Sequence, residues 1–184
     1  FPGGDIGWLA VCGTVNDLAM VGAQPLGLAA AFVLEEGLEG DDLARWADSM
    51  GRACREAGTE LVAADTKVVE RGAADRAFIT TAGVGVVPKG VRISASLATP
   101  GDIVLVSGPV GDHGATILSL REGLGLEADL NSDAAPLVEP VTALLQACEV
   151  HVLRDPTRGG LAQTLNEVAA SSRCRMELDE AAIP

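Results

Sequence analysis

The sequence predicts an α+β fold in which helices cover one face of a mixed or antiparallel sheet, followed by the start of a second α+β unit. The main observation is the order of segments up to residue 88, where hydrophobic spacing indicates a helix, a strand, a helix and two strands. Hydrophobic residues make up 48% of the 184 residues, which is ample for a buried core. Only 3% are aromatic, so we expect an aliphatic core closely packed around alanine and glycine.

The first helix is predicted from Asp5 to Val21, with Asp5 as its N-terminal cap and a break near Gly13. Pro25 is expected to end this helix, because proline disfavours helical geometry in the residue before it. The apolar run 26–34 then has the length of a strand, and a Glu-Glu-Gly sequence closes it.

The second helix, from Asp41 to Ala57, has the clearest pattern in the chain. Asp41 and Asp42 suit the positive N-terminus of a helix, and Gly58 suits its C-terminal cap. One face is predicted to be buried by residues at helical spacing, namely Leu43, Trp46, Ala47, Met50, Cys54 and Ala57.

Two further strands are predicted at 60–69 and 77–87, joined by a polar turn at 71–75. Alternation places four side chains of the first of these strands on one face, namely Val62, Ala64, Thr66 and Val68.

We expect residues 1–88 to form an N-terminal unit, residues 89–101 a linker with a short strand within 91–98, and residues 102–184 a second unit. The elements predicted in the second unit are a strand at 102–107, a glycine loop at 108–114, helices at 115–121 and 137–148, a strand at 150–153, and a loop at 155–160 that opens a helix ending near residue 170. Both ends of the chain look cut, so we expect it to be a fragment.

The net charge and the cysteines of the chain limit which partners and which cellular compartment we expect. The net charge is −13 and the 13 basic residues are scattered, which argues against nucleic acid and anionic membrane surfaces as partners. The four cysteines form no C-x-x-C pair, as expected for reduced thiols in a cytoplasmic protein. The apolar stretch 6–21 is too short and too polar to span a bilayer, because it contains Asn16 and Asp17.

The first candidate site consists of polar residues inside two apolar runs. Asn16 and Asp17 interrupt one run, and Asp65, Thr66 and Lys67 interrupt another. Such groups are costly to bury unless something binds them, and carboxylate oxygens are ligands that Mg²⁺ prefers. The pattern therefore predicts a site for a metal-bound phosphate. A helix break and a surface turn explain the same residues equally well.

Two glycine loops are further candidates. Glycines at 108, 111 and 114 precede a predicted helix, whose N-terminus would attract an anion, and His113 fits either substrate contact or capping. In the second loop, Asp155 fits a metal ligand or a helix cap, and Arg158 fits a phosphate partner. An ordinary capped helix start with a surface arginine also fits this loop.

Taken together, four motifs resemble the HypE family of carbamoyl dehydratases, which act in the maturation of nickel–iron hydrogenases. They are Gly-Thr-Val-Asn-Asp-Leu-Ala-Met at 13–20, Asp-Thr-Lys-Val-Val at 65–69, Ser-Gly-x-x-Gly-Asp-His-Gly at 107–114 and Arg-Asp-Pro-Thr-Arg-Gly-Gly-Leu at 154–161. The resemblance implies the PurM-like two-domain architecture of aminoimidazole ribonucleotide synthetase. Its N-terminal domain would form a homodimer with a shared barrel and ATP near the interface.

The resemblance also implies the reaction and its partners. In this family ATP activates a thiocarboxamide on a C-terminal cysteine, and elimination gives the thiocyanate that supplies the cyanide ligand of the hydrogenase. The carbamoyl group would come from the carbamoyltransferase HypF, and the cyanide would pass to the HypC–HypD scaffold complex. ATP and Mg²⁺ are the implied cofactors.

Residue roles follow from the motif match. The resemblance implies catalytic roles for Lys67 and His113, and metal binding by Asp17, Asp65 and Asp155. The residues implied in nucleotide binding are Asn16, Asp17, Asp65, Thr66, Asp155, Thr157, Arg158 and Gly159.

Three departures from the family pattern matter. Ala64 stands where the family has glycine, the family's first acidic nucleotide motif is absent, and so is the cysteine-bearing tail, which Cys174 does not replace. We therefore expect this chain to be inactive by itself. The alternatives are a non-catalytic dimerisation and docking module, or another PurM-like enzyme such as selenophosphate synthetase or thiamine monophosphate kinase.

Overall fold

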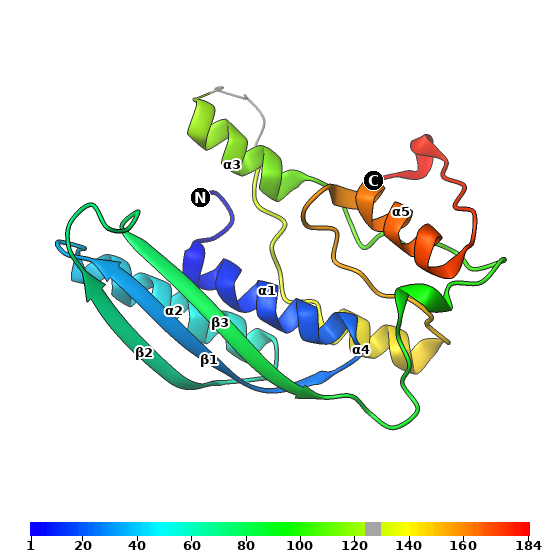
Figure 1. Cartoon of the computed structure of the whole chain (residues 1–184), viewed down its shortest axis with the longest axis horizontal. Coiled ribbons are helices and arrows are strands. Elements are labelled where there is room, and N and C mark those ends of the chain that lie inside the picture. The colour runs from blue at the N-terminus through cyan, green and yellow to red at the C-terminus, as the bar shows by residue number, and fades with distance from the viewer. Residues whose placement is uncertain (124–129) are drawn as a thin grey trace.

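The computed structural model describes residues 1–123 and 130–184, and Figure 1 shows a curved sheet packed against helices. The sheet has the strand order β2-β1-β3, with β1 parallel to β2 and antiparallel to β3. This mixed sheet confirms the predicted α+β fold and the predicted order of elements up to residue 88. The elements of this part are α1 (Ile6–Met20), β1 (Gln24–Glu35), α2 (Gly40–Glu56), β2 (Leu61–Val69) and β3 (Ala77–Val86).

Helix α1 begins where the sequence predicts and ends earlier for a different reason. Asp5 caps it, since its Oδ1 accepts a hydrogen bond from the backbone N–H of Trp8 at 2.9 Å. The predicted break near Gly13 is wrong, because the helix runs through this residue without interruption. Gly22, with φ of +72°, turns the chain after the helix, and Pro25 already lies within β1.

Helix α2 matches its predicted range and differs on its buried face. Trp46, Met50 and Cys54 are buried as predicted, whereas Ala47 is exposed and Ser49 is buried in its place. The hydroxyl of Ser49 donates to Asp5 Oδ2 at 2.7 Å, which satisfies this buried polar group and links α2 to the cap of α1. Gly58, with φ of +68°, follows the helix as predicted.

The core lies between the two helices and one face of the sheet, here called the inner face. It is built mainly from aliphatic side chains, including Val11, Val15, Leu28, Phe32 and Met50. The aliphatic core predicted from composition is therefore confirmed.

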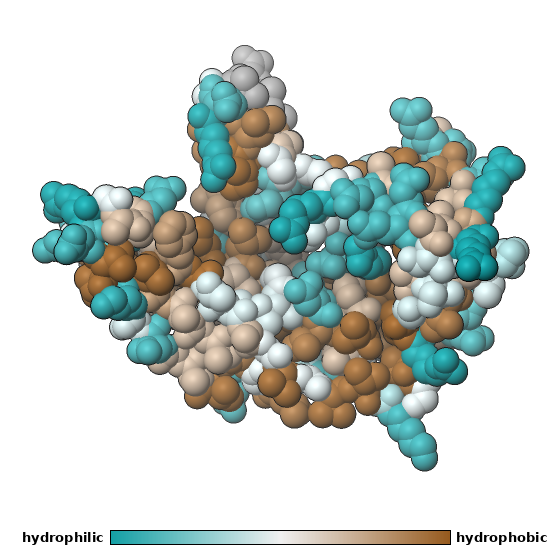
Figure 2. All heavy atoms as spheres, in the orientation of Figure 1, coloured by the Kyte–Doolittle hydropathy of each residue, from teal (hydrophilic) through white to brown (hydrophobic). Residues whose placement is uncertain are grey.

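The opposite face of the sheet, here called the outer face, has no helix of the described residues packed on it. Ala31 and Val33 of β1 alternate with the buried residues Phe32 and Leu34, so they point to this outer face. Several large apolar side chains are exposed on the strands and at their ends, namely Leu26, Val62, Phe78, Val84 and Val86. In Figure 2 hydrophobic residues gather along the lower side of the molecule, where Figure 1 places the strands.

The second part of the chain contains α3 (Asp112–Glu122), α4 (Val138–Ala147), α5 (Gly160–Ser172) and the 3₁₀ helices η1 (Ala95–Leu97) and η2 (Glu180–Ala182). The three α-helices confirm the predicted helices of this part. Helix α4 packs against the end of α1, and α5 packs against η1.

The strands predicted at 91–98, 102–107 and 150–153 are wrong. The first segment contains η1, and the other two have no regular structure. A strand needs a neighbour for its backbone N–H and C=O groups, and within the described ranges no strand pairs with these segments. Ile103 and Leu105 accordingly stay 84% and 74% exposed.

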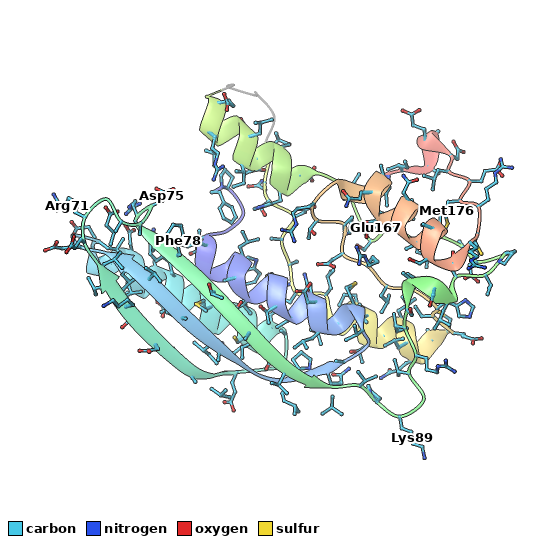
Figure 3. The ribbon with its side chains drawn as sticks, in the orientation of Figure 1. Arg71, Asp75, Phe78, Lys89, Glu167 and Met176 are labelled. Carbon is cyan, nitrogen blue, oxygen red and sulfur yellow. The ribbon has the colours of Figure 1, made fainter. Side chains whose placement is uncertain are left out.

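No helix among the described residues combines the length and the apolar character needed to cross a membrane. The polar turn predicted between β2 and β3 is present, and Figure 3 places Arg71 and Asp75 there.

Candidate functional site

Asp17 and Asp155 are the two predicted site residues that the structure brings within electrostatic reach of each other. Asp17 is exposed in the last turns of α1, and Asp155 is half-buried in the loop before α5. Burial raises the pKa of the Asp155 carboxyl, and the charge of Asp17 raises it further, while Arg154 has the opposite effect. Two carboxylates from segments far apart in the sequence thus share a place where a bound cation would be favourable.

The loop that carries Asp155 leads into a helix N-terminus without a side-chain cap. The N-cap of α5 is Gly159, with φ of +74°, and no side chain of the described residues bonds to it as a cap. The helix-cap alternative for Asp155 is therefore wrong. The first backbone N–H groups of an α-helix have no partner within the helix, and their dipole favours an anion. Thr157 and Arg158 are exposed beside this end.

The two arginines of this loop differ in their surroundings. Arg154 pairs with Glu167 of α5 at 2.7 Å, and Gln163 donates to the other oxygen of the same carboxylate at 2.9 Å. Arg158 is exposed, and the described residues form no ion pair with it. The phosphate contact predicted for Arg158 stays a prediction.

Asn16 uses its side chain on the protein backbone. Its Nδ2 donates to the carbonyl of Ala135 at 3.0 Å, and its Oδ1 accepts from the N–H of Leu137 at 2.8 Å. The amide therefore connects α1 to the extended segment that leads into α4. The nucleotide contact predicted for Asn16 stays a prediction.

His113 lies at the start of α3, in contact with residues near the N-terminus. Its Nδ1 lies 2.9 Å from the hydroxyl of Ser132, its backbone N–H donates to Asp133, and its ring packs edge-on against Phe1 at 5.4 Å. These contacts fit a residue that anchors the start of a helix. The catalytic role predicted for His113 stays a prediction.

Asp65 and Lys67 lie on the outer face of the sheet, opposite to α1. Asp65 pairs with Ala31 and Lys67 with Val33, and paired residues of neighbouring strands point to the same face. Asp65 Oδ1 accepts a hydrogen bond from the backbone N–H of Thr66 at 2.8 Å. Figure 1 shows β2 at the edge of the sheet, away from the loop before α5.

The three predicted metal ligands therefore do not converge within one chain. Among residues 1–123 and 130–184, no group of three histidine, cysteine or acidic side chains is placed to hold a metal ion. Asp17 lies close enough to Asp155 to act on its carboxyl, whereas Asp65 lies on the outer face of the sheet. The metal-binding roles predicted for these three residues stay predictions.

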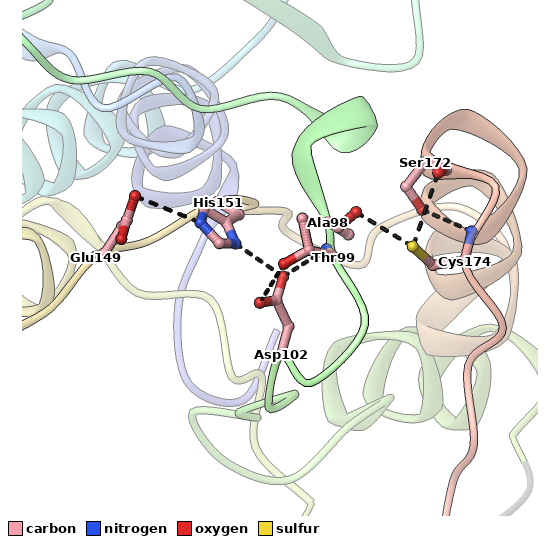
Figure 4. Close-up of polar contacts among 7 residues, drawn as sticks. All are labelled: Ala98, Thr99, Asp102, Glu149, His151, Ser172 and Cys174. Carbon is pink, nitrogen blue, oxygen red and sulfur yellow. Dashed lines mark hydrogen bonds and ion pairs between the residues drawn. The ribbon is translucent and has the colours of Figure 1, made fainter.

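A second polar cluster, which the sequence reasoning missed, connects the linker to the segment after α4 (Figure 4). His151 Nδ1 lies 2.9 Å from Asp102 Oδ2, and Asp102 also accepts from the backbone N–H and hydroxyl of Thr99 at 2.8 and 3.0 Å. The hydrogen bond to Asp102 raises the pKa of the His151 imidazole. The partners are far apart in sequence, so no local pattern indicates them.

An open groove of about 430 Å³ lies next to this cluster. Its lining comes from the linker and from the end of α4, and includes Arg92, Ile93, Leu145, Cys148 and His151. None of the residues predicted for nucleotide binding lines it, so we place the candidate site at Asp17 and Asp155 and not in this groove.

Comparison with known proteins shows the family to which the chain is similar. The profile of the AIR synthase related protein N-terminal domain matches residues 1–87, and that of the C-terminal domain matches residues 99–184. The chain is 60% identical to the carbamoyl dehydratase HypE of Azotobacter vinelandii, over the whole chain and 54% of that protein. It thus spans about half the length of the curated relatives it matches.

Solved structures show the same similarity. The crystal structure of E. coli HypE aligns with all of this chain and 57% of its own, with a TM-score of 0.95 and 50% identity. A HypE structure in complex with ATP aligns with 94% of this chain and 52% of its own, with a TM-score of 0.89 and 56% identity. A HypE–HypF complex aligns with 94% of this chain and 57% of its own, with a TM-score of 0.90 and 53% identity.

Proposed function

This chain belongs to the AIR synthase related family, within its HypE branch, and on that premise we propose that it forms part of the Mg-ATP site of a carbamoyl dehydratase. The reaction would be the ATP-dependent dehydration of a C-terminal cysteine thiocarboxamide to a thiocyanate, the source of the cyanide ligand of nickel–iron hydrogenase. The observation that carries the proposal is the approach of Asp17 to Asp155 beside the uncapped N-terminus of α5.

The donor set at this place fits a cation with a phosphate. Mg²⁺ takes one or two carboxylates and completes its coordination with phosphate oxygens and water, and Asp17 and Asp155 supply the carboxylates. The N–H of Gly160 donates to the carbonyl of Thr157 at 3.2 Å. In this proposal, the next N–H groups of α5, those of Leu161 and Ala162, and the guanidinium of Arg158 bind phosphate oxygens, with Thr157 beside them. When bound, Mg-ATP would supply the phosphoryl group that turns the thiocarboxamide oxygen into a leaving group.

The outer face of the sheet supports a homodimer. Val62, Val84 and Val86 are 53–67% exposed there, and burial of such a patch is favourable. In this proposal a second copy of the chain covers the outer face, so that Asp65 and Lys67 lie in the interface. The metal role of Asp65 and the catalytic role of Lys67 would then be exerted at a site shared by two chains. Thr66 pairs with the buried Phe32 and so points to the inner face, and its binding role stays a prediction.

The remaining assignments belong to the same proposal. Residues 1–88 would form the dimerising unit, and residues 102–184, reached through 89–101, would carry the second half of the nucleotide site. The solved HypE–HypF complex supports HypF as a partner. The HypC–HypD scaffold as acceptor and a cytoplasmic location complete the proposal. Thiamine monophosphate kinases, at 24% identity or less, share only the fold.

The experiment is calorimetric titration of Mg-ATP into the chain and two variants. Asp17→Asn and Asp155→Asn each remove one carboxylate charge, and we expect each to weaken binding by roughly 10- to 100-fold, the worth of a charged contact. Asp48→Asn is the matched control, because Asp48 is exposed on α2. Absence of binding by the unmodified chain would favour the docking-module alternative.

A further inference from the structure

We propose that Asn16 is a positioning residue, whose side-chain amide holds residues 135–137 against α1 and thereby sets where Asp17 and Asp155 lie relative to each other. This role differs from the direct nucleotide contact that the sequence predicted for Asn16. The inference rests on the proposed function only in that these two carboxylates are taken to bind Mg-ATP. The hydrogen bonds between Asn16 and the backbone form within the chain itself and do not depend on a bound nucleotide.

Both polar groups of the Asn16 side-chain amide, the donor Nδ2 and the acceptor Oδ1, form hydrogen bonds at the same time. Nδ2 donates to the carbonyl of Ala135 at 3.0 Å, and Oδ1 accepts from the N–H of Leu137 at 2.8 Å. Asparagine provides a donor and an acceptor side by side, which matches a carbonyl and an N–H two residues apart on an extended backbone. We call this pair of hydrogen bonds the Asn16 clamp.

The Asn16 clamp is the middle one of three links that dock residues 134–142 along α1 and its end. On one side, the indole N–H of Trp8 donates to the carbonyl of residue 134 at 2.7 Å. On the other side, the Gln24 amide donates to the hydroxyl of residue 142 at 2.9 Å. Val138, which follows the clamp directly, is buried in the shared core. The clamp therefore fixes the start of α4 on α1.

From this anchored start the chain reaches Asp155 through α4 and residues 148–154. Asp17 follows Asn16 directly, so the clamp and the first carboxylate share one turn of α1. If the clamp opens, the start of α4 is released from α1, and the separation of the two carboxylates is no longer fixed.

The experiment compares Asn16→Ala and Asn16→Asp with Gln24→Ala, which removes a neighbouring link without touching the clamp. The first readout is hydrogen exchange at the Leu137 amide without nucleotide. We expect exchange to accelerate about tenfold in Asn16→Ala, equivalent to about 1.4 kcal/mol, and to change little in Gln24→Ala. Asn16→Asp keeps the acceptor and the size of the side chain, so it should fold and accelerate exchange less than Asn16→Ala.

The second readout is Mg-ATP affinity, which should fall in Asn16→Ala together with the protection of the Leu137 amide. Unchanged Leu137 exchange with lower affinity would overturn the inference and make Asn16 a direct ligand. If the unmodified chain binds no Mg-ATP, the proposed function fails, whereas the exchange of the Leu137 amide still decides on the clamp.

Discussion

The contact between α1 and α2 at Gly7 gives the sharpest prediction about stability. A Cβ atom built on Gly7 would lie 2.9 Å from the carbonyl carbon of Trp46 and 3.0 Å from its Cα, and closer still to the carbonyl oxygen. These are backbone atoms of α2, which cannot rotate away as a side chain can. The substitution Gly7→Ala should therefore force the two helices apart.

The expected magnitude comes from a comparison with Gly13 in the same helix. Overpacking a close contact costs roughly 1–3 kcal/mol. A Cβ on Gly13 meets nothing within 4 Å, so Gly13→Ala should stabilise α1 by roughly 0.5–1 kcal/mol through helix propensity. The two variants should thus differ by about 1.5–4 kcal/mol, which is roughly 3–16 °C in melting temperature for a chain of this size.

The assay is thermal and urea unfolding of both variants beside the unmodified chain. Equal stability of Gly7→Ala and Gly13→Ala would refute the close approach of α1 and α2. Helix α1 also carries Asn16 and Asp17. The displacement of this helix in Gly7→Ala should therefore weaken Mg-ATP binding, whereas Gly13→Ala, which leaves the helix in place, should bind Mg-ATP as the unmodified chain does.

Two further predictions concern the linker cluster and the outer face. The hydrogen bond to Asp102 raises the pKa of His151 above its ordinary value of 6.5. The ion pair therefore stabilises the folded chain fully below pH 6.5, and this contribution is lost as pH rises through the pKa of the folded state. The melting-temperature difference between the unmodified chain and Asp102→Asn should hence shrink from pH 6 to pH 8.5, and a constant difference would contradict the ion pair. On the outer face, Val84→Glu should lower self-association in sedimentation velocity, because it buries a charge in the proposed interface. Lys89→Glu is the control and should not lower it, because Lys89 lies outside the strands. Equal effects of the two variants, or no association of the unmodified chain at any concentration, would rule out this dimer.

The N-terminal half of the fold could be predicted because its signals are local. Asp5 at a helix start and Gly58 after a helix end act within a few residues, and both are confirmed. The spacing along α2 is local too; its predicted range is confirmed, and its predicted buried face is confirmed at Trp46, Met50 and Cys54. The burial of Ser49 in place of Ala47 was missed, because it depends on Asp5 of another helix.

The strands of the second part were wrong for a physical reason. The apolar run 102–107 has the composition of a strand, but strand formation depends on pairing with a second segment, which composition does not reveal. For the same reason the sequence did not indicate the contact between Asp102 and His151.

The candidate site could be predicted in its residue types and only partly in its arrangement. Asp17 and Asp155 stand out as polar residues in apolar or glycine-rich surroundings, and the structure brings them together. Asp65 lies on the outer face because it pairs with Ala31 of the neighbouring strand. A sequence motif around Asp65 does not contain this pairing. The partners of Asn16 are backbone groups, which have no sequence signature.

The most direct test of the proposed site uses Mn²⁺ in place of Mg²⁺, because the paramagnetic ion broadens the NMR signals of nearby amides. Titration of the chain with ATP and Mn²⁺ should broaden the amides around Asp17 and those of residues 155–160 first, and Asp155→Asn should abolish this pattern. Broadening centred on the groove beside His151, or none beyond that caused by Mn²⁺ without ATP, would contradict a nucleotide site at Asp17 and Asp155.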